Sequence, residues 1–216
     1  MKETTAEEVW LPNVPLIKLK LADHIVEYLW KQIDKAALNQ RDANGNLAGN
    51  ISKSLYLDDD NDYFYNNVLL SVCHDYYEKY HMAIPCFRNS TSNKDSPTGM
   101  SIKNFWVNSQ RQTEFNPIHD HGGVMSFVVW MKIPTKSEDQ HNLPISANSN
   151  SPVASDFQLS YLNVFGAMRS INIAMDPEVE GSMLLFPSTM MHQVYPFYEC
   201  DDDRITISGN LYYNID

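Results

Sequence analysis

The spacing of apolar residues changes about halfway along the chain, from a helical period to a strand period. Alternation over positions 15–21 predicts a half-buried strand, and apolar residues four apart over 22–36 predict an amphipathic helix. A second helix is predicted from about 62 to 80. Beyond Met100, short apolar or alternating runs predict seven strands, at 102–108, 125–133, 157–164, 170–175, 182–186, 193–196 and 204–213.

This order of elements predicts an α+β fold, with a β-sandwich or barrel and the N-terminal helices packed on one sheet. We expect one domain over residues 1–216, in which 1–99 form a helical support and 100–216 form the β core. The polar segments 89–99 and 135–155 are predicted connectors. The second connector is long enough to act as the cover of a functional site.

Composition excludes some partners. The net charge is −11 and no cluster of Lys and Arg is present, so we expect no nucleic-acid partner. No apolar stretch approaches the roughly 20 residues of a membrane span, so no membrane association is expected. The polar N-terminus has no signal-peptide core, which predicts a cytoplasmic protein, in the host cytoplasm if a virus encodes it. The three scattered cysteines are predicted to be free thiols.

Two neighbouring histidines and one distant histidine point to a metal site. His119 and His121 are two residues apart, so on a strand both imidazoles share one face while Asp120 points to the other. His192 follows the apolar run 184–187, where a buried strand would end, and is the best third candidate. Three neutral imidazoles suit Fe(II) or Zn(II). The other histidines are predicted to be structural or solvated: His24, His74, His81 and His141.

The predicted strand that begins at Arg204 suggests an anion site. Alternation places Arg204 and Thr206 on one face, where a guanidinium and a hydroxyl can hold a carboxylate. In the alternative, Arg204 only neutralises the adjacent acidic run 201–203. Asn108 lies on a strand eleven residues ahead of His119 and could contact other oxygens of the same ligand.

Six segments together carry a family resemblance: 106–108, 116–121, 126–131, 185–187, His192 and 204–210. With them the chain resembles the 2-oxoglutarate/Fe(II)-dependent oxygenase superfamily. In particular it is similar to oxygenases related to prolyl 4-hydroxylase from marine bacteria and from phages of cyanobacteria, which positions 47–52 also resemble. The resemblance implies a double-stranded β-helix (jelly-roll or cupin-like) core, Fe(II), 2-oxoglutarate as cosubstrate and O2. It further implies a dioxygenase that hydroxylates a protein side chain, such as a prolyl residue, or a small molecule.

By position, the resemblance implies His119 and His192 as iron ligands and Arg204 with Thr206 as the 2-oxoglutarate clamp. The superfamily's usual ligands are His-x-Asp and a distal His, and this chain has His121 where the Asp is expected. The related subgroup also shows His-x-His, so we expect a three-histidine site. An inward turn of Asp120 before Gly122 would instead restore a carboxylate ligand. Three neutral histidines would leave the iron less electron-rich.

Two other functions fit the same residues. A cupin-like metalloenzyme would use the three histidines without 2-oxoglutarate, and it would be favoured if Arg204 faced solvent. A non-catalytic jelly-roll binding module would keep the histidines as structural residues only.

Overall fold

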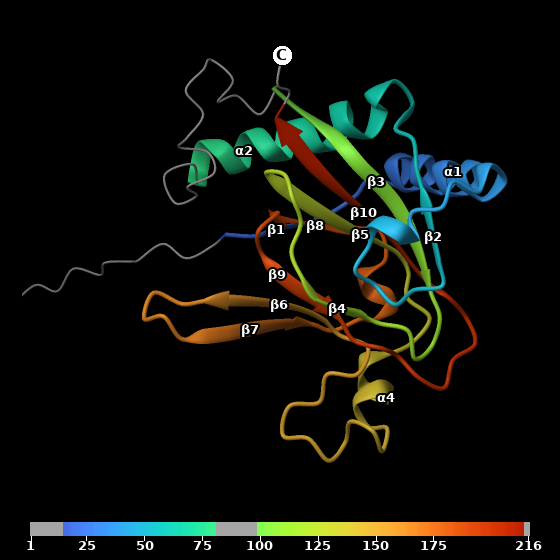
Figure 1. Cartoon of the computed structure of the whole chain (residues 1–216), viewed down its shortest axis with the longest axis vertical. Coiled ribbons are helices and arrows are strands. Elements are labelled where there is room, and N and C mark those ends of the chain that lie inside the picture. Colours follow the sequence, from blue (N-terminus) through green and yellow to red (C-terminus); the bar gives the residue numbers. More distant parts are fainter. Residues whose placement is uncertain (1–14, 81–98, 214–216) are drawn as a thin grey trace, which may run out of the picture.

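The computed structural model describes residues 15–80 and 99–213, which form two antiparallel sheets that face each other (Figure 1). The larger sheet has six strands in the order β1-β8-β5-β10-β3-β2, and the smaller has four in the order β4-β9-β6-β7. The strands are β1 (Ile17–Lys20), β2 (Lys53–Tyr56), β3 (Met100–Gln110), β4 (Asn116–His119), β5 (Met125–Lys132), β6 (Phe157–Leu162), β7 (Met168–Ile173), β8 (Ser182–Pro187), β9 (Met191–Val194) and β10 (Arg204–Tyr213). The described helices are α1 (Asp23–Asn39), α2 (Leu70–Tyr80) and α4 (Ser137–His141), with a π-helical turn at Tyr65–Leu69 and 3-10 turns at Asn44–Asn46, Asp60–Asp62 and Pro177–Val179.

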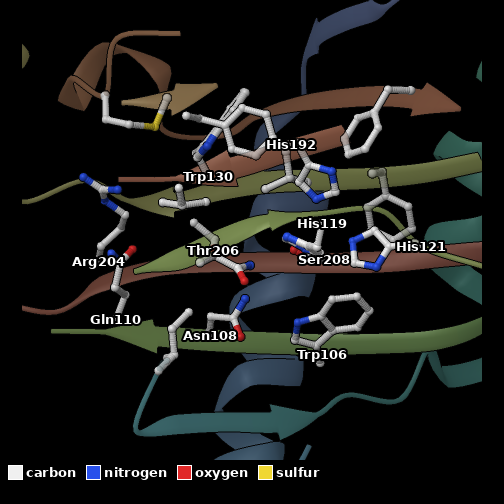
Figure 2. A pocket seen from close by; sticks show the side chains of 18 residues that line it. Trp106, Asn108, Gln110, His119, His121, Trp130, His192, Arg204, Thr206 and Ser208 are labelled. Atoms are coloured by element: carbon white, nitrogen blue, oxygen red, sulfur yellow. The ribbon is translucent and has the colours of Figure 1, made fainter. Parts of the chain in front are cut away.

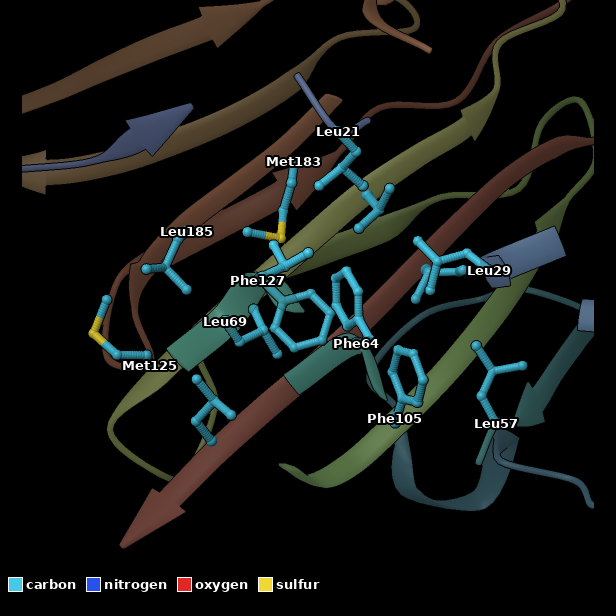
Figure 3. Close-up of a cluster of buried hydrophobic side chains, with 14 of the residues drawn as sticks. Leu21, Leu29, Leu57, Phe64, Leu69, Phe105, Met125, Phe127, Met183 and Leu185 are labelled. Carbon is cyan, nitrogen blue, oxygen red and sulfur yellow. The ribbon is translucent and has the colours of Figure 1, made fainter. Parts of the chain in front are cut away.

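The two longer helices pack on the outer face of the six-stranded sheet, which confirms the predicted α+β arrangement (Figure 1). Ile25 and Leu29 of α1 are buried, in keeping with their four-residue spacing. The fully buried ring of Phe64 lies 6.1 Å from the ring of Phe105 and 5.6 Å from that of Phe127 (Figure 3). This cluster supports the large sheet from one side, so the other face of the sheet can line a cavity.

Strand β5 is buried on both faces, which explains the continuous apolar run in the sequence. Phe127 and Val129 belong to the core beneath the helices. Val128 and Trp130 belong to a second core, which lies between the two sheets. The space between the sheets therefore has apolar walls, and each polar side chain within it needs an explanation.

Several strands differ from the expectation. Strand β7 spans Met168–Ile173 instead of 170–175, and β4 ends at His119, so His121 lies beyond the strand expected to hold both histidines. The sequence pattern does not predict β2, a four-residue strand that pairs with β3 at the edge of the large sheet. Strand β9 spans Met191–Val194 instead of 193–196, so His192 lies inside a strand and not at the end of the buried strand before it. The chain reverses between β8 and β9, where the backbone N–H of Met190 donates to the carbonyl of Pro187 at 2.9 Å. A short reversal of this kind is set by turn geometry, which apolar periodicity does not record.

The long polar segment 135–155 is more ordered than a simple connector. It contains α4, and its two ends, Thr135 and Ser155, are buried. Figure 1 shows this segment at the opposite end of the molecule from α1 and α2. Of the other predicted connector, 89–99, all but Gly99 lies outside the described residues. Within residues 15–80 and 99–213, no helix is both long enough and apolar enough to cross a membrane.

Candidate functional site

Three histidines from the small sheet and the turn beside it meet between the sheets. His119 ends β4 and is the antiparallel partner of His192 on β9. His121 follows two residues after β4, and its ring centroid lies 4.9 Å from that of each of the other two. One potential ligand atom from each residue lies within 4.8 Å of the others. Figure 2 shows the three rings turned toward one another at one end of a cavity.

The hydrogen bonds of two of these histidines prepare them to bind a metal. Nδ1 of His119 lies 2.6 Å from the carbonyl oxygen of Pro117, and Nδ1 of His192 lies 2.9 Å from that of Met190. A carbonyl can only accept a hydrogen bond, so each Nδ1 carries the proton and each Nε2 keeps a lone pair. Burial lowers the pKa of His119, and it lowers the pKa of His192 to about 3 and that of His121 to about 4. All three are therefore neutral near pH 7, as metal ligands must be.

A tight turn between β4 and β5 brings His121 into the group. The backbone N–H of His121 donates to the carbonyl of Ser188 at 2.9 Å. Gly123 has φ +100°, and a Cβ at this position would lie 2.6 Å from the carbonyl oxygen of Leu211. Only glycine fits this backbone without strain. The Gly122-Gly123 pair in the sequence thus has a local cause, which is the turn that redirects the chain after the second histidine.

Asp120 lies outside the histidine group. Its side chain is exposed and contributes to a second cavity beside the histidines. Among the described residues, the group that could hold a metal ion contains His119, His121 and His192, and no carboxylate. This geometry favours the three-histidine arrangement over the alternative with Asp120 turned inward.

Arg204 lies at the other end of the same cavity (Figure 2). In the register of β10 against β3, Arg204 pairs with Gln110 and Thr206 pairs with Asn108. Cross-strand partners point to the same face of a sheet, so these four side chains line one wall. All six residues singled out from the sequence line this cavity: Asn108, His119, His121, His192, Arg204 and Thr206.

The guanidinium of Arg204 is buried and only partly satisfied by the protein. Arg204 is 1% exposed; its Nη2 donates to Oγ of Ser155 at 2.6 Å, and its Cζ lies 5.0 Å from the ring centroid of Phe197. Nε and Nη1 are buried without a hydrogen-bond partner. Burial lowers the pKa of Arg204 to about 9, against the opposing effect of Asp156, so the group is still charged near pH 7. A buried cation with unused donors fits the carboxylate of a bound anion.

The alternative that Arg204 neutralises the acidic run 201–203 is wrong. Each acid of that run has another partner: the amide of Gln112 donates to Asp201 at 2.9 Å, Lys132 lies 3.3 Å from Asp202, and Arg111 lies 4.0 Å from Asp203. Arg204 points inward because alternation in β10 turns it away from the exposed acidic residues before the strand.

Asn108 is buried in the wall between the histidines and Arg204. Its Oδ1 accepts a hydrogen bond of 2.7 Å from Oγ of Ser54 on β2. With the oxygen engaged by Ser54, the amide nitrogen faces the cavity (Figure 2). The amide can therefore donate to a ligand oxygen.

A second cavity adjoins the first at Trp106, Asn108, His119 and His121. Residues of the loop before β2, among them Leu47, Gly49 and Ile51, form its far wall. No residue of the segment 135–155 is among the described residues that line either cavity. The expectation that this segment covers the site is therefore wrong, because both of its ends are fixed in the protein behind Arg204.

Sequence reasoning missed the residues behind Arg204. Ser155 belongs to no recognisable sequence motif. The apolar pattern does not indicate that it contacts Arg204, which lies 49 positions later. Asp156 is 2% exposed, and its carboxylate lies 3.0 Å from Nε2 of His141. No signal in the sequence marks this acid, because acidic residues are mostly exposed and the burial of one that precedes a predicted strand follows only from the packing.

Comparisons with known proteins give a family and a fold. A family model described as "Putative 2OG-Fe(II) oxygenase" matches residues 104–210. Among solved structures, the chain is similar to a prolyl-4-hydroxylase from Pseudomonas putida, with 12% identity, 93% of each chain covered and a TM-score of 0.51. It is also similar to a prolyl hydroxylase from Trichoplax adhaerens in complex with a hypoxia inducible factor oxygen degradation domain peptide fragment, with 15% identity, 92% of this chain and 82% of that chain covered, and a TM-score of 0.49. No curated protein matches the chain. The likeness to the Pseudomonas structure confirms the predicted double-stranded β-helix fold.

Proposed function

Since the chain belongs to the 2-oxoglutarate/Fe(II)-dependent oxygenase superfamily, we propose that it hydroxylates a C–H bond with O2, Fe(II) and 2-oxoglutarate. One observation carries the proposal: three neutral histidines lie at one end of a cavity, and a buried guanidinium with unused donors lies at the other. The two ends match the two requirements of this chemistry, which are a metal with open positions and a fixed carboxylate binder.

We propose that His119, His121 and His192 hold the iron. Their lone pairs converge, and the carbonyls that face Nδ1 of His119 and His192 fix both rings. When bound, Fe(II) supplies the redox chemistry by which O2 and 2-oxoglutarate give succinate, carbon dioxide and a hydroxylated product. Three protein ligands leave coordination positions for the cosubstrate and O2.

Arg204 and Thr206 would bind the distal carboxylate of 2-oxoglutarate, and Asn108 would donate its amide N–H to an oxygen nearer the metal. Apolar side chains of both sheets surround this path, among them Trp130 and Phe157. Such walls exclude water and strengthen the interaction between Arg204 and the carboxylate.

The second cavity is the proposed entry for the substrate, because it reaches the histidines from the side away from Arg204. Asp120 is the only charged side chain among the described residues that line it, because His119 and His121 are neutral. A neutral or cationic substrate therefore fits better than an anionic one. The similar Pseudomonas protein is a prolyl-4-hydroxylase, so a prolyl residue in a peptide is the first substrate to test, followed by other side chains and small molecules.

The metalloenzyme that does without 2-oxoglutarate is not favoured. That function would be favoured by an Arg204 that faces solvent, whereas Arg204 is 1% exposed and lines the cavity.

The test is an anaerobic titration of the protein with Fe(II) and then 2-oxoglutarate. We expect a weak visible charge-transfer band that needs both additions, followed by succinate formation when air is admitted. His192→Ala should remove the band, and His24→Ala, which changes an exposed histidine of α1, is the matched control. A protein that gives neither band nor succinate would contradict the proposal.

A further inference from the structure

Arg204 raises a physical problem that the proposed function does not by itself solve. A buried cation is costly unless a counter-charge lies near it, yet a direct ion pair would occupy the N–H groups that a ligand needs. The residues behind Arg204 meet both demands. They come from the end of the segment 135–155 and the residue after it, which line neither cavity.

Ser155 fixes the direction of the guanidinium. It is fully buried, and its Oγ accepts the Nη2 hydrogen bond at 2.6 Å while lying 3.4 Å from Oγ1 of Thr135. Its backbone N–H donates to the carbonyl of Pro196 at 2.8 Å. Ser155 also has φ +76°, a conformation that costs free energy for any residue with a side chain. A strained residue that its surroundings hold in place often has a functional role.

Asp156 supplies the counter-charge. Its carboxylate accepts the hydrogen bond from Nε2 of His141, and it raises the pKa of Arg204 through space. Besides His141 and Arg204, the only other charged group that acts on Asp156 among the described residues is Asp176. The Asp156 carboxylate thus balances Arg204 while its own hydrogen bond goes elsewhere, which leaves Nε and Nη1 of Arg204 unpartnered.

We propose that Ser155 and Asp156 prepare Arg204 to receive 2-oxoglutarate: Ser155 orients the guanidinium, and Asp156 balances its charge without occupying its donors. Both act through Arg204 and are positioning residues. This inference rests on the proposed function and adds two residues to it. The segment 135–155 is then a fixed support of the cosubstrate site, anchored by α4 and His141.

The two residues should have opposite effects on binding. Loss of the Ser155 hydroxyl leaves Arg204 free to take other orientations, so a ligand must order it again and binds more weakly. Loss of the Asp156 charge leaves Arg204 without a counter-charge, so the ligand-free protein becomes less stable. The dianionic cosubstrate then supplies the negative charge that Asp156 no longer provides, and the Asp156 carboxylate no longer repels it. It therefore binds at least as tightly as in the wild type.

The experiment measures, by calorimetry, the affinity of the Ni(II)-loaded protein for 2-oxoglutarate and for 2-oxopentanoate. The second has the same chain length without the distal carboxylate. Ser155→Gly removes the hydroxyl and tolerates the positive φ, so it tests the hydrogen bond without added strain. We expect it to weaken 2-oxoglutarate binding roughly fivefold to tenfold and to leave 2-oxopentanoate unchanged. Ser146→Ala, which changes another buried serine of the same segment, should alter neither affinity.

Asp156→Asn keeps the shape of the side chain and its ability to accept from His141. We expect a lower melting temperature without ligand and a larger upward shift on addition of 2-oxoglutarate than in the wild type. Unchanged affinities in Ser155→Gly, equal loss of both ligands, or a smaller shift in Asp156→Asn would overturn the inference while the proposed function stands. A wild type that does not bind 2-oxoglutarate would overturn both.

Discussion

The substitution Arg204→Met tests whether Arg204 stabilises the fold or serves to bind a ligand. Without ligand, two unpartnered donors destabilise the fold by about 1–3 kcal/mol each. The hydrogen bond to Ser155 returns about 1.5–3 kcal/mol, and the contact with the ring of Phe197 returns about 0.5–2 kcal/mol. These contributions nearly cancel, and Asp156 keeps its hydrogen bond with His141 at 3.0 Å when Arg204 is replaced. Arg204→Met should therefore change the free energy of unfolding by less than about 2 kcal/mol.

The same substitution should nearly abolish 2-oxoglutarate binding. Two hydrogen bonds from a charged group to a carboxylate are worth about 3–6 kcal/mol together, which corresponds to a loss of roughly 10²- to 10⁴-fold in affinity. Urea unfolding followed by tryptophan fluorescence measures the stability, and calorimetry with Ni(II)-loaded protein measures the affinity. Arg111→Met, at a side chain that is 72% exposed, is the matched control and should change neither. A destabilisation of more than about 3 kcal/mol, or retention of affinity within about tenfold, would refute the reasoning.

Three further predictions concern the metal ligands, the pH dependence and the turn. His121→Ala should weaken Ni(II) binding at least about tenfold, whereas Asp120→Ala should change it less than about twofold; the reverse result would identify Asp120 as the ligand. Because burial lowers the pKa of Arg204 to about 9, the charge is lost as the pH rises, so 2-oxoglutarate affinity should be constant from about pH 7 to 8 and fall above about pH 9. If the affinity for 2-oxoglutarate fell only below pH 7, Arg204 would not be the group that controls it. Gly123→Ala should lower the free energy of unfolding by about 1–3 kcal/mol, measured in urea, because the new Cβ meets the carbonyl of Leu211; an unchanged midpoint would show that the turn relaxes freely.

Strand alternation decided most of the candidate site before any tertiary information. Residues two apart on a strand share a face, so the sequence alone placed Arg204 with Thr206 and His119 with His121. All four side chains line the cavity, but strand alternation accounts only for Arg204 and Thr206. Strand β4 ends at His119, and the turn after it brings His121 to the same side. The α+β fold followed in the same way from the change of period near Met100. These features are local, because they depend on backbone geometry over a few residues.

The sequence did not determine which distant residues meet. Sheet register decides that His119 on β4 pairs with His192 on β9. The packing of the two sheets decides that Ser155 contacts Arg204, 49 positions away. The segment 135–155 shows the difference clearly: polarity and length predicted a cover, whereas its buried ends make it a support. The order of residues thus determined which chemical groups are available and, within a strand, which of them share a face. Only the tertiary structure decided that a cation would be buried with unused donors, because burial and hydrogen-bond satisfaction are properties of the packed whole.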